Sequence, residues 1–352
     1  MRTSQFDYHL PAELVAQFPA RRRDASRLMV LDRQSGSTTI GPFRNLLDYL
    51  KKGDALVVNS TKVFKARLFG HRASGGKVEI FLVRPLPDAG EMENKRGIAP
   101  WVGMVSPSRR VREGEQILFE SYRVILQKDL GGGLWQVGFQ SRSQFQRIVG
   151  RFGHVPLPHY IKRQDQPCDI RRYQTIFADP NQVGAVAAPT AGFHFTRSLL
   201  GRIRNNGVEI IETCLHVGPG TFKPVKAADI DDHVVDPEYA VLSPRAAKSL
   251  NRIRERGGSI FAVGTTSVRT LESARMINGE IQPFSSMVDL YVKPNFEFRV
   301  VDHLMTNFHL PKSSLLILVG AFAGRERILS AYREAIENRL RFYSYGDAML
   351  IL

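Results

Sequence analysis

The feature that most constrains the fold of this chain is a change of periodicity at about Val63. From there, short segments alternate polar and apolar residues with period two, and turns rich in Gly, Ser and Pro separate them. This pattern predicts β-strands, and helical periodicity does not return until about Ser143. Several short strands at regular spacing favour a small barrel or sandwich, which we assign to residues 62–151.

Strands and helices alternate on both sides of this block. Buried strands are expected at residues 55–58, 208–215 and 259–263, with helical segments around them. This rhythm predicts a mostly parallel sheet. We therefore expect an α/β catalytic domain with a mostly parallel sheet, formed by residues 1–61 and 152–352, into which the small all-β barrel domain is inserted.

The charge of the chain is unusual for its ordinary hydrophobic content of 43%. Lys and Arg number 49 against 34 Asp and Glu, which leaves a net charge of +15 and a sequence pI of about 10.0. Such an excess favours a partner with a phosphate backbone, although a basic solvated surface would give the same composition.

Cysteine content and hydropathy limit the remaining classes. The two cysteines, Cys168 and Cys214, give neither a disulfide framework nor a metal-ligand cluster, so we expect no metal site. The first residues contain no apolar signal segment, and the apolar run that begins at Leu315 is too short to span a bilayer. We therefore expect a cytoplasmic protein without membrane association.

Motifs of several common enzyme classes are absent from the sequence. It has no GxGxxG after a strand, no GxxxxGK[ST] loop, no HExxH or CxxC pattern and no GxSxG. Dehydrogenases, P-loop ATPases, zinc hydrolases and serine hydrolases depend on these motifs, so the sequence argues against all four classes.

Two histidines, His194 and His216, stand in turns of small residues, GAVAAPTAGFHFT and LHVGPGTF. Small residues let a backbone approach a ligand closely, and histidine can exchange a proton near neutral pH. Either histidine alone could simply bond to backbone groups within a tight turn. The matched pair favours a site, which we extend to four neighbours: Thr190, Gly192, Gly218 and Gly220.

A second candidate lies at the strand-to-helix junction AVGTTSVRTLESA. It places Thr265, Thr266 and Ser267 at a helix N-terminus, where free amides and the helix dipole favour anions. Arg269 and Glu272 share one face of that helix and could bind a ligand or pair with each other. Two further candidates, in the segment HLMTNFHLPKSS, precede another helix: Asn307 and His309.

Longer strings of the chain resemble a known family. These are FDYHLPAELVAQFPA, RDASRLMVLDR, DALVVNSTKVFKARLFG, GAVAAPTAGFHFT, LHVGPGTF, AVGTTSVRTLES, VVDHLMTNFHLPKSSLLILVGAFAG and RFYSYGDAMLI. In this order, from about Phe6 to Leu350, they are similar to the S-adenosylmethionine:tRNA ribosyltransferase-isomerase family of queuosine synthesis.

The resemblance implies an unusual use of S-adenosylmethionine. Members transfer and isomerise its ribosyl part onto 7-aminomethyl-7-deazaguanine at the tRNA wobble position. The product is epoxyqueuosine in tRNA, and adenine and methionine are released. The resemblance also implies an α/β domain with an inserted β-barrel domain. S-adenosylmethionine is then a co-substrate, and we expect no cofactor, a tRNA partner and a monomer.

That chemistry requires a base for the 5′ carbon, a donor for the departing adenine and a proton acceptor for the aminomethyl group. We expect the catalytic residues among His194, His216, His233 and Asp347. Our hypothesis is that His194 and His216 flank the reacting ribose. In the same hypothesis, three side chains hold the methionine carboxylate or a tRNA phosphate: Arg269, Thr265 and Ser267.

The chain departs from the family pattern in several places. Asp236 stands where the family commonly has a second histidine after the one matched by His233. Further departures are Lys293 and Asn295 in VKPN, where IYPG is expected, Ser60 and Lys65 after the first buried strand, and Cys214 in place of threonine. If the position of Asp236 is catalytic, either the carboxylate has to serve as the base there or the role lies elsewhere.

Two alternatives remain open. A non-catalytic tRNA-binding protein would satisfy the charge and would tolerate loss of the turn histidines. An S-adenosylmethionine-dependent RNA methyltransferase would use the same co-substrate, but this chain lacks the glycine-rich loop expected after its first strand. A divergent paralogue that modifies another base is a further form of the main hypothesis.

Overall fold

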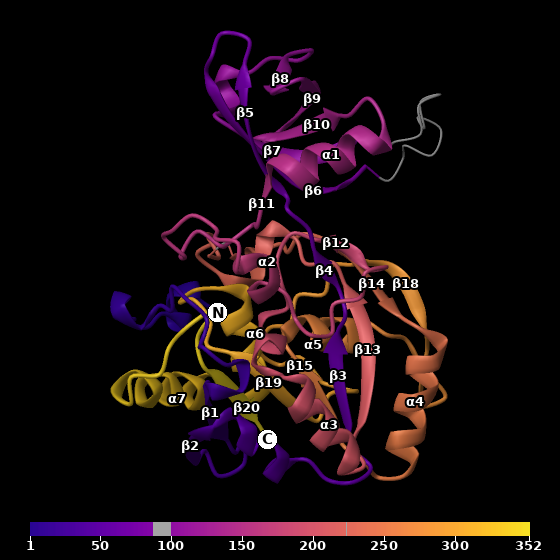
Figure 1. The fold of residues 1–352 in the computed structure, drawn as a ribbon. Helices are drawn as coiled ribbons and strands as arrows, with labels where there is room; N and C mark the ends of the chain where they lie inside the picture. The colour runs from indigo at the N-terminus through magenta and orange to yellow at the C-terminus, as the bar shows by residue number, and fades with distance from the viewer. Residues whose placement is uncertain (87–99, 223) are drawn as a thin grey trace.

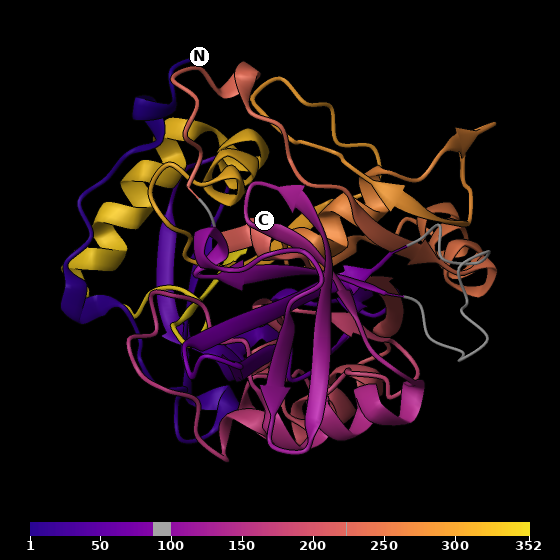
Figure 2. The same cartoon turned by 90° about the horizontal axis from the view of Figure 1, so that it is seen from above.

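The computed structural model describes residues 1–86, 100–222 and 224–352. Residues 87–99, which belong to the predicted barrel segment, therefore lie outside the described residues. Figure 1 shows two units, a small barrel and a larger unit in which helices surround a sheet. Seen from above, the barrel lies over the larger unit (Figure 2).

Nine strands form the sheet of the larger unit. In spatial order they are β18 (Phe284–Val288), β14 (Glu238–Leu242), β13 (Glu209–Leu215), β3 (Ala55–Asn59), β15 (Ile260–Val263), β19 (His303–Asn307), β20 (Ala348–Ile351), β1 (Arg27–Leu31) and β2 (Thr38–Pro42). The α/β prediction is confirmed. The four central strands from β13 to β19 are parallel, whereas β18, β14 and β2 at the edges are antiparallel to their neighbours.

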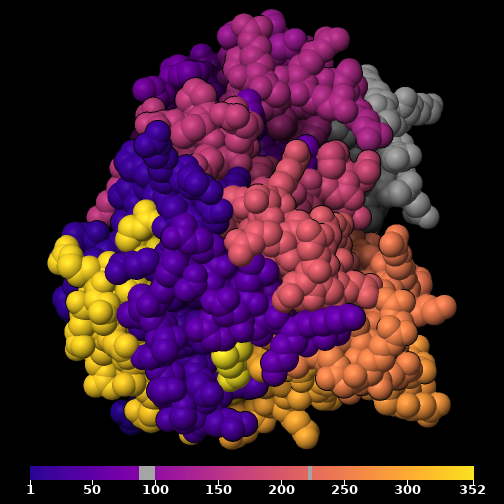
Figure 3. Space-filling view, turned by 60° about the horizontal axis from the view of Figure 1, so that its bottom comes forward, coloured from indigo at the N-terminus to yellow at the C-terminus, as the bar shows by residue number. Residues whose placement is uncertain are grey.

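The arrangement of β20 and β2 explains why the sheet is mixed. Strand β20 runs antiparallel to β19 and parallel to β1, so it brings the C-terminus beside the N-terminal strands. The neighbouring indigo and yellow surfaces are visible in Figure 3. Strands β1 and β2 are joined by residues 32–37 alone, and so short a connection permits only an antiparallel pair.

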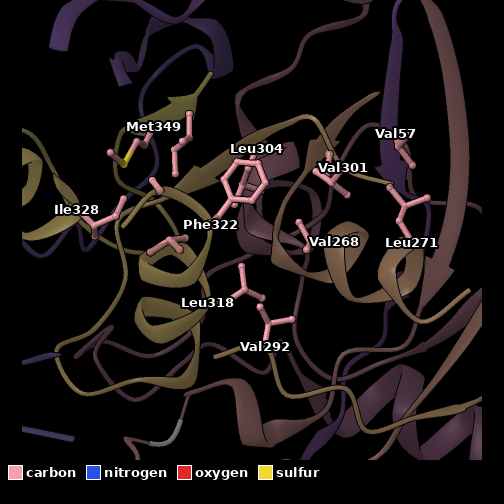
Figure 4. Packing of buried hydrophobic residues seen from close by; sticks show 14 of the residues in the cluster. Val57, Val268, Leu271, Val292, Val301, Leu304, Leu318, Phe322, Ile328 and Met349 are labelled. Atoms are coloured by element: carbon pink, nitrogen blue, oxygen red, sulfur yellow. The ribbon is translucent and has the colours of Figure 1, made fainter. Parts of the chain in front are cut away.

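Helices cover both faces of the sheet. One face carries α4 (Pro244–Glu255), α5 (Thr265–Glu272), α6 (Ser314–Ala323) and α7 (Arg325–Glu337), and the other carries α3 (Arg197–Asn205) and the 3₁₀ helix η4 (Phe43–Tyr49). Met29 and Val57 pack on the first face, Leu28 and Leu56 on the second, because side chains alternate along a strand. Figure 4 shows the first of these cores, in which side chains of α5 and α6 meet the sheet.

Six strands close into the barrel. Around it they are β5 (Arg67–Arg72), β6 (Lys77–Pro85), β7 (Trp101–Ser106), β10 (Leu134–Gly138), β9 (Tyr122–Gly131) and β8 (Gln116–Phe119). Closure comes from antiparallel pairing of β5 with β8. A Cβ at Gly70 would lie 2.7 Å from Ile117 Cγ2, so a glycine is needed where β5 approaches β8. Helix α1 (Arg142–Phe152) packs Ile148 into the barrel core.

Short elements connect the two units. Strand β4 (Lys62–Val63) pairs with β12 (Val183–Ala185), and β11 (Gly153–His154) pairs with β5 of the barrel. The remaining elements are η1 (Thr3–Phe6), η2 (Ala12–Leu14), η3 (Arg23–Ala25), η6 (Ser108–Arg110), α2 (Asp169–Arg172), η7 (Thr190–His194), η8 (Pro219–Phe222), η9 (Ile230–Asp232), β16 (Met276–Ile277) and β17 (Glu280–Ile281). Within the described residues, no helix is long and apolar enough to cross a membrane.

Candidate active site

A cavity opens beyond the carboxyl ends of β15 and β19, which are parallel neighbours in the sheet. In open α/β sheets, ligands bind at this end of the strands. We call it cavity A, and its empty volume is about 610 Å³. It contains four predicted site residues: Thr190, Thr265, Asn307 and His309. Its other lining residues include Tyr160, Gly264, Thr266, Thr306, Ser313, Leu315 and Tyr343.

The N-terminus of α5 forms one wall of cavity A. Gly264 precedes the helix with φ of +88°, a backbone conformation that favours glycine, and its amide donates to Met305 O at 2.7 Å. The amides of Thr265 and Thr266 are the first two of the helix and have no intrahelical acceptor. Among the described residues, the buried Thr266 Oγ1 also has no hydrogen-bond partner. This wall therefore presents three unused donors to an anion.

Asn307, the last residue of β19, also lines cavity A and is held in one orientation. Its Oδ1 accepts from Thr190 Oγ1 at 3.1 Å, and its Nδ2 donates to His194 Nε2 at 3.2 Å. Nδ1 of His194 therefore carries the proton and donates to Ser26 Oγ at 2.7 Å. His194 is buried behind Asn307, has both ring nitrogens bonded, and reaches cavity A only through that amide.

Two of the candidate histidines, His194 and His309, are buried. Burial lowers the pKa of both His194 and His309 to about 3, so both rings are neutral near pH 7. His309 lines cavity A, and its Nε2 lies 2.8 Å from Thr306 Oγ1. His309 is therefore the titratable imidazole that the structure places in the wall of this cavity.

His216 lies outside cavity A. Its Nδ1 is 2.8 Å from Thr61 Oγ1, and its ring stacks on Tyr239 with centroids 5.9 Å apart. Partial burial lowers its pKa. A Cβ on Gly184 would lie 2.8 Å from the imidazole, which explains the small residue that precedes the first histidine turn. The structure thus places the two turn histidines in different surroundings.

Asp347 and Glu272 bind backbone amides elsewhere. The buried Asp347 carboxylate accepts from the amides of Arg27 and Arg341, each at 2.8 Å. Glu272 accepts from three successive amides, at 2.9, 3.1 and 2.9 Å: Arg299, Val300 and Val301. Neither residue lines cavity A, and the alternative of an Arg269–Glu272 pair is not formed.

Two further predicted residues also serve local structure. Ser267 Oγ donates to Val263 O at 2.8 Å, and the side chain is buried. Gly192 packs against Thr175, since a Cβ there would lie 2.7 Å from Thr175 Cγ2. The anion-binding signal at α5 therefore belongs to Thr265 and Thr266 rather than to Ser267.

A second cavity, cavity B, lies beside the first and has an empty volume of about 790 Å³. Leu315, in the first turn of α6, lines both cavities. Cavity B contains the predicted residues His233, Arg269 and Gly220. Its other lining residues are Val234, Val235, Asp236, Glu238, Leu290, Tyr291, Val292, Ser314 and Leu318.

Glu238 fixes one side of cavity B. Its buried carboxylate accepts from the amide of Gly218 at 2.6 Å and pairs with the guanidinium of Arg269. Burial raises the pKa of Glu238, and Arg269 opposes that shift. Sequence reasoning missed this residue. The available signal was an acidic residue at the start of the otherwise apolar strand β14, where a buried charge requires a partner.

Burial also affects His233, whose pKa is lowered although Asp236 opposes the shift. Its ring meets Tyr291 edge-on, with centroids 5.3 Å apart. In the described part of the chain, no group of three His, Cys, Asp or Glu side chains could hold a metal ion. Cavity A can therefore bind an anion. Cavity B brings two carboxylates together with the imidazole of His233 and the phenol of Tyr291.

Comparison with known proteins gives one consistent kind of relative. The family model described as Queuosine biosynthesis protein matches residues 3–351. Proteins named S-adenosylmethionine:tRNA ribosyltransferase-isomerase from Citrifermentans bemidjiense and Carboxydothermus hydrogenoformans are 47% and 45% identical, with 100% of each chain aligned. The crystal structure of S-adenosylmethionine tRNA ribosyltransferase from Thermotoga maritima is 35% identical, with a TM-score of 0.56 over 99% of this chain and 100% of that one.

Proposed function

Because the chain belongs to the queuosine biosynthesis protein family, we propose a reaction in which both described cavities take part. The chain is an S-adenosylmethionine:tRNA ribosyltransferase-isomerase. In our proposal it moves the ribosyl moiety of S-adenosylmethionine onto 7-aminomethyl-7-deazaguanine at the tRNA wobble position. Epoxyqueuosine-tRNA forms, and adenine and methionine are released.

Cavity A is the proposed S-adenosylmethionine site. The observation that carries this assignment is the set of unused donors at α5, two amides and Thr266 Oγ1. A carboxylate satisfies such donors, and S-adenosylmethionine carries one at its methionine end. The rings of Tyr160 and Tyr343 also line the cavity, and aromatic faces attract cations such as a sulfonium.

Residues of cavity A then divide into direct and indirect roles. His309 is neutral near pH 7, and with a pKa of about 3 its ring is a weak base, so it suits a hydrogen bond to the ribose better than removal of a proton from carbon. Asn307 can donate to or accept from the ribose only in the orientation that His194 and Thr190 enforce. We therefore assign His309 as a group that contacts the ribose and His194 as a positioning residue.

The proposed tRNA partner agrees with the distribution of charge. Residues 62–151 contain sixteen Lys and Arg against eight Asp and Glu, so about a quarter of the chain carries +8 of the net +15. Basic surfaces of this kind bind phosphate backbones. We propose that the barrel contacts tRNA outside the modified base, and that the protein acts as a cytoplasmic monomer without a bound cofactor.

A double-label assay tests this function. Substrate tRNA is mixed with enzyme and S-adenosylmethionine labelled either in the ribose or in the methyl group, and the nucleosides are separated. We expect the ribose label in the tRNA together with free adenine. A methyl label in the tRNA would support the methyltransferase instead, and bound but unlabelled tRNA would support a non-catalytic binding protein.

A further inference from the structure

Cavity B contains polar groups that nothing else in the described structure uses. The hydroxyl of Tyr291 is buried and has no hydrogen-bond partner among the described residues. Burial raises its pKa to about 12, so the group is a protonated donor near pH 7. Within the same described ranges, the carboxylate of Asp236 makes no hydrogen bond or ion pair. The lining therefore offers a free acceptor and a free phenol.

The charges of cavity B leave one negative charge uncompensated. Arg269 is neutralised by Glu238, and its Nε and Nη2 are held by Leu290 O at 3.1 Å and Val288 O at 3.4 Å. The lowered pKa of His233 leaves that ring neutral near pH 7. Asp236 is then the remaining charge, so the cavity favours a ligand that carries a cation.

Part of the lining of cavity B is aromatic and apolar. The edge-on rings of His233 and Tyr291 provide one aromatic wall, and apolar side chains of Leu315 and Leu318 provide another. Val234 is 85% exposed although it also lines the cavity. A cleft that combines aromatic and apolar side chains with polar groups is typical of a site for a flipped base.

Glycine at position 220 permits this arrangement. A Cβ there would lie 2.8 Å from Asp236 Oδ2, so any other residue would displace the carboxylate. The loop that carries Gly220 also contains Gly218, whose amide is bonded to Glu238. The glycines of the second histidine motif therefore shape cavity B, whereas Val217 of the same turn lines cavity A.

We propose that cavity B receives the acceptor base, with Asp236 paired to its aminomethyl ammonium and Tyr291 bonded to a polar atom of the ring system. This inference rests on the proposed function. Leu315 lines both cavities, so in this proposal the base and the S-adenosylmethionine of cavity A meet beside it, at the first turn of α6. Asp236 thus supplies charge recognition at the position where the family resemblance leads one to expect histidine.

A pair of RNA ligands tests the proposal. Both are anticodon stem–loops, one with 7-aminomethyl-7-deazaguanine at the wobble position and one with 7-methyl-7-deazaguanine, which lacks the ammonium. The full chain is titrated with each by fluorescence anisotropy. We expect the wild type to prefer the aminomethyl RNA by up to about fivefold, the strength of one charge pair at an exposed carboxylate such as Asp236.

Asp236→Asn should reduce this preference to about one while leaving the Kd for the methyl RNA and for S-adenosylmethionine unchanged. Asp232→Asn is the matched control, because Asp232 is an exposed carboxylate on the same segment that does not line cavity B. It should keep the wild-type preference. Tyr291→Phe should weaken both RNAs equally, because the ring system is common to them.

Other outcomes overturn the inference. If Asp236→Asn weakens the binding of S-adenosylmethionine but not the binding of either RNA, cavity B holds the co-substrate. If it weakens both RNAs equally, the carboxylate does not recognise the ammonium. If the wild type binds S-adenosylmethionine but neither RNA, the proposed tRNA substrate is wrong. This outcome is distinct from a change in the ratio of the two RNA affinities, which tests the role of Asp236 alone.

Discussion

Replacing Thr266 with valine should have opposite effects on folding and on ligand binding. The two side chains have the same shape, and the change removes a buried hydroxyl that has no partner in the described structure. Burying an unpaired hydroxyl is unfavourable, so Thr266→Val should raise the free energy of unfolding by about 1 kcal/mol. The same change removes a proposed hydrogen bond to a carboxylate, worth about 1.5 kcal/mol or more, and should weaken S-adenosylmethionine binding about tenfold or more.

The measurement uses two ligands and two variants. Calorimetry gives the Kd for S-adenosylmethionine and for its decarboxylated analogue, and urea denaturation gives the stability without ligand. Thr270→Val is the control, because Thr270 lies on the same helix but its hydroxyl donates to Thr266 O at 3.0 Å. It should lower stability by about 1 kcal/mol and leave both Kd values unchanged.

Comparison of S-adenosylmethionine with its decarboxylated analogue tests whether Thr266 binds the carboxylate. Thr266→Val should weaken S-adenosylmethionine and leave the decarboxylated analogue as it is in the wild type. If the variant weakens both ligands equally, the hydroxyl does not bind the carboxylate. If stability also falls, the hydroxyl has a partner in the native protein, and our description of the α5 wall is wrong.

Three further predictions follow from the same structure. Glu238→Leu should destabilise the protein by about 3 kcal/mol in urea denaturation, because it leaves Arg269 buried without its partner; an unchanged midpoint would contradict this. The free energy of unfolding should fall as pH drops from about 6.5 toward 3. Buried His194 and His309 have pKa values of about 3 in the folded protein, so the unfolded chain binds more protons in this range. His194→Gln should lower the slope of the free energy of unfolding against pH by about 1.4 kcal/mol per pH unit. The affinity for tRNA should fall with rising salt, and Arg147→Ser in the barrel should lower the slope of log K against log salt by about one, whereas an unchanged slope would place that arginine outside the interface.

The sequence predicted the fold class well because both of its signals are local. Period-two alternation from about Val63 marked the barrel strands, and alternating strands and helices marked the α/β unit. The order and direction of strands were harder to predict. Strand β20 inserts between β19 and β1, which are far apart in the sequence, and no local pattern carries that information.

The candidate site was harder still, because residue type and motif do not reveal what a side chain contacts. His194 and Asp347 stand in conspicuous motifs, yet both are buried and bonded to neighbouring groups of the fold. Glu238 stood outside the predicted set, and its environment became evident only when distant segments were placed around it. Thr265 was predicted from its place at a helix N-terminus and Asn307 from its place before another helix, and both line cavity A.

A crystal structure of the protein with S-adenosylmethionine bound tests the central assignment most directly. Our account predicts the ligand in cavity A, with its carboxylate within hydrogen-bonding distance of Thr266 Oγ1 and of the amides of Thr265 and Thr266. Density for S-adenosylmethionine in cavity B, with its carboxylate on Arg269, would contradict the assignment of both cavities.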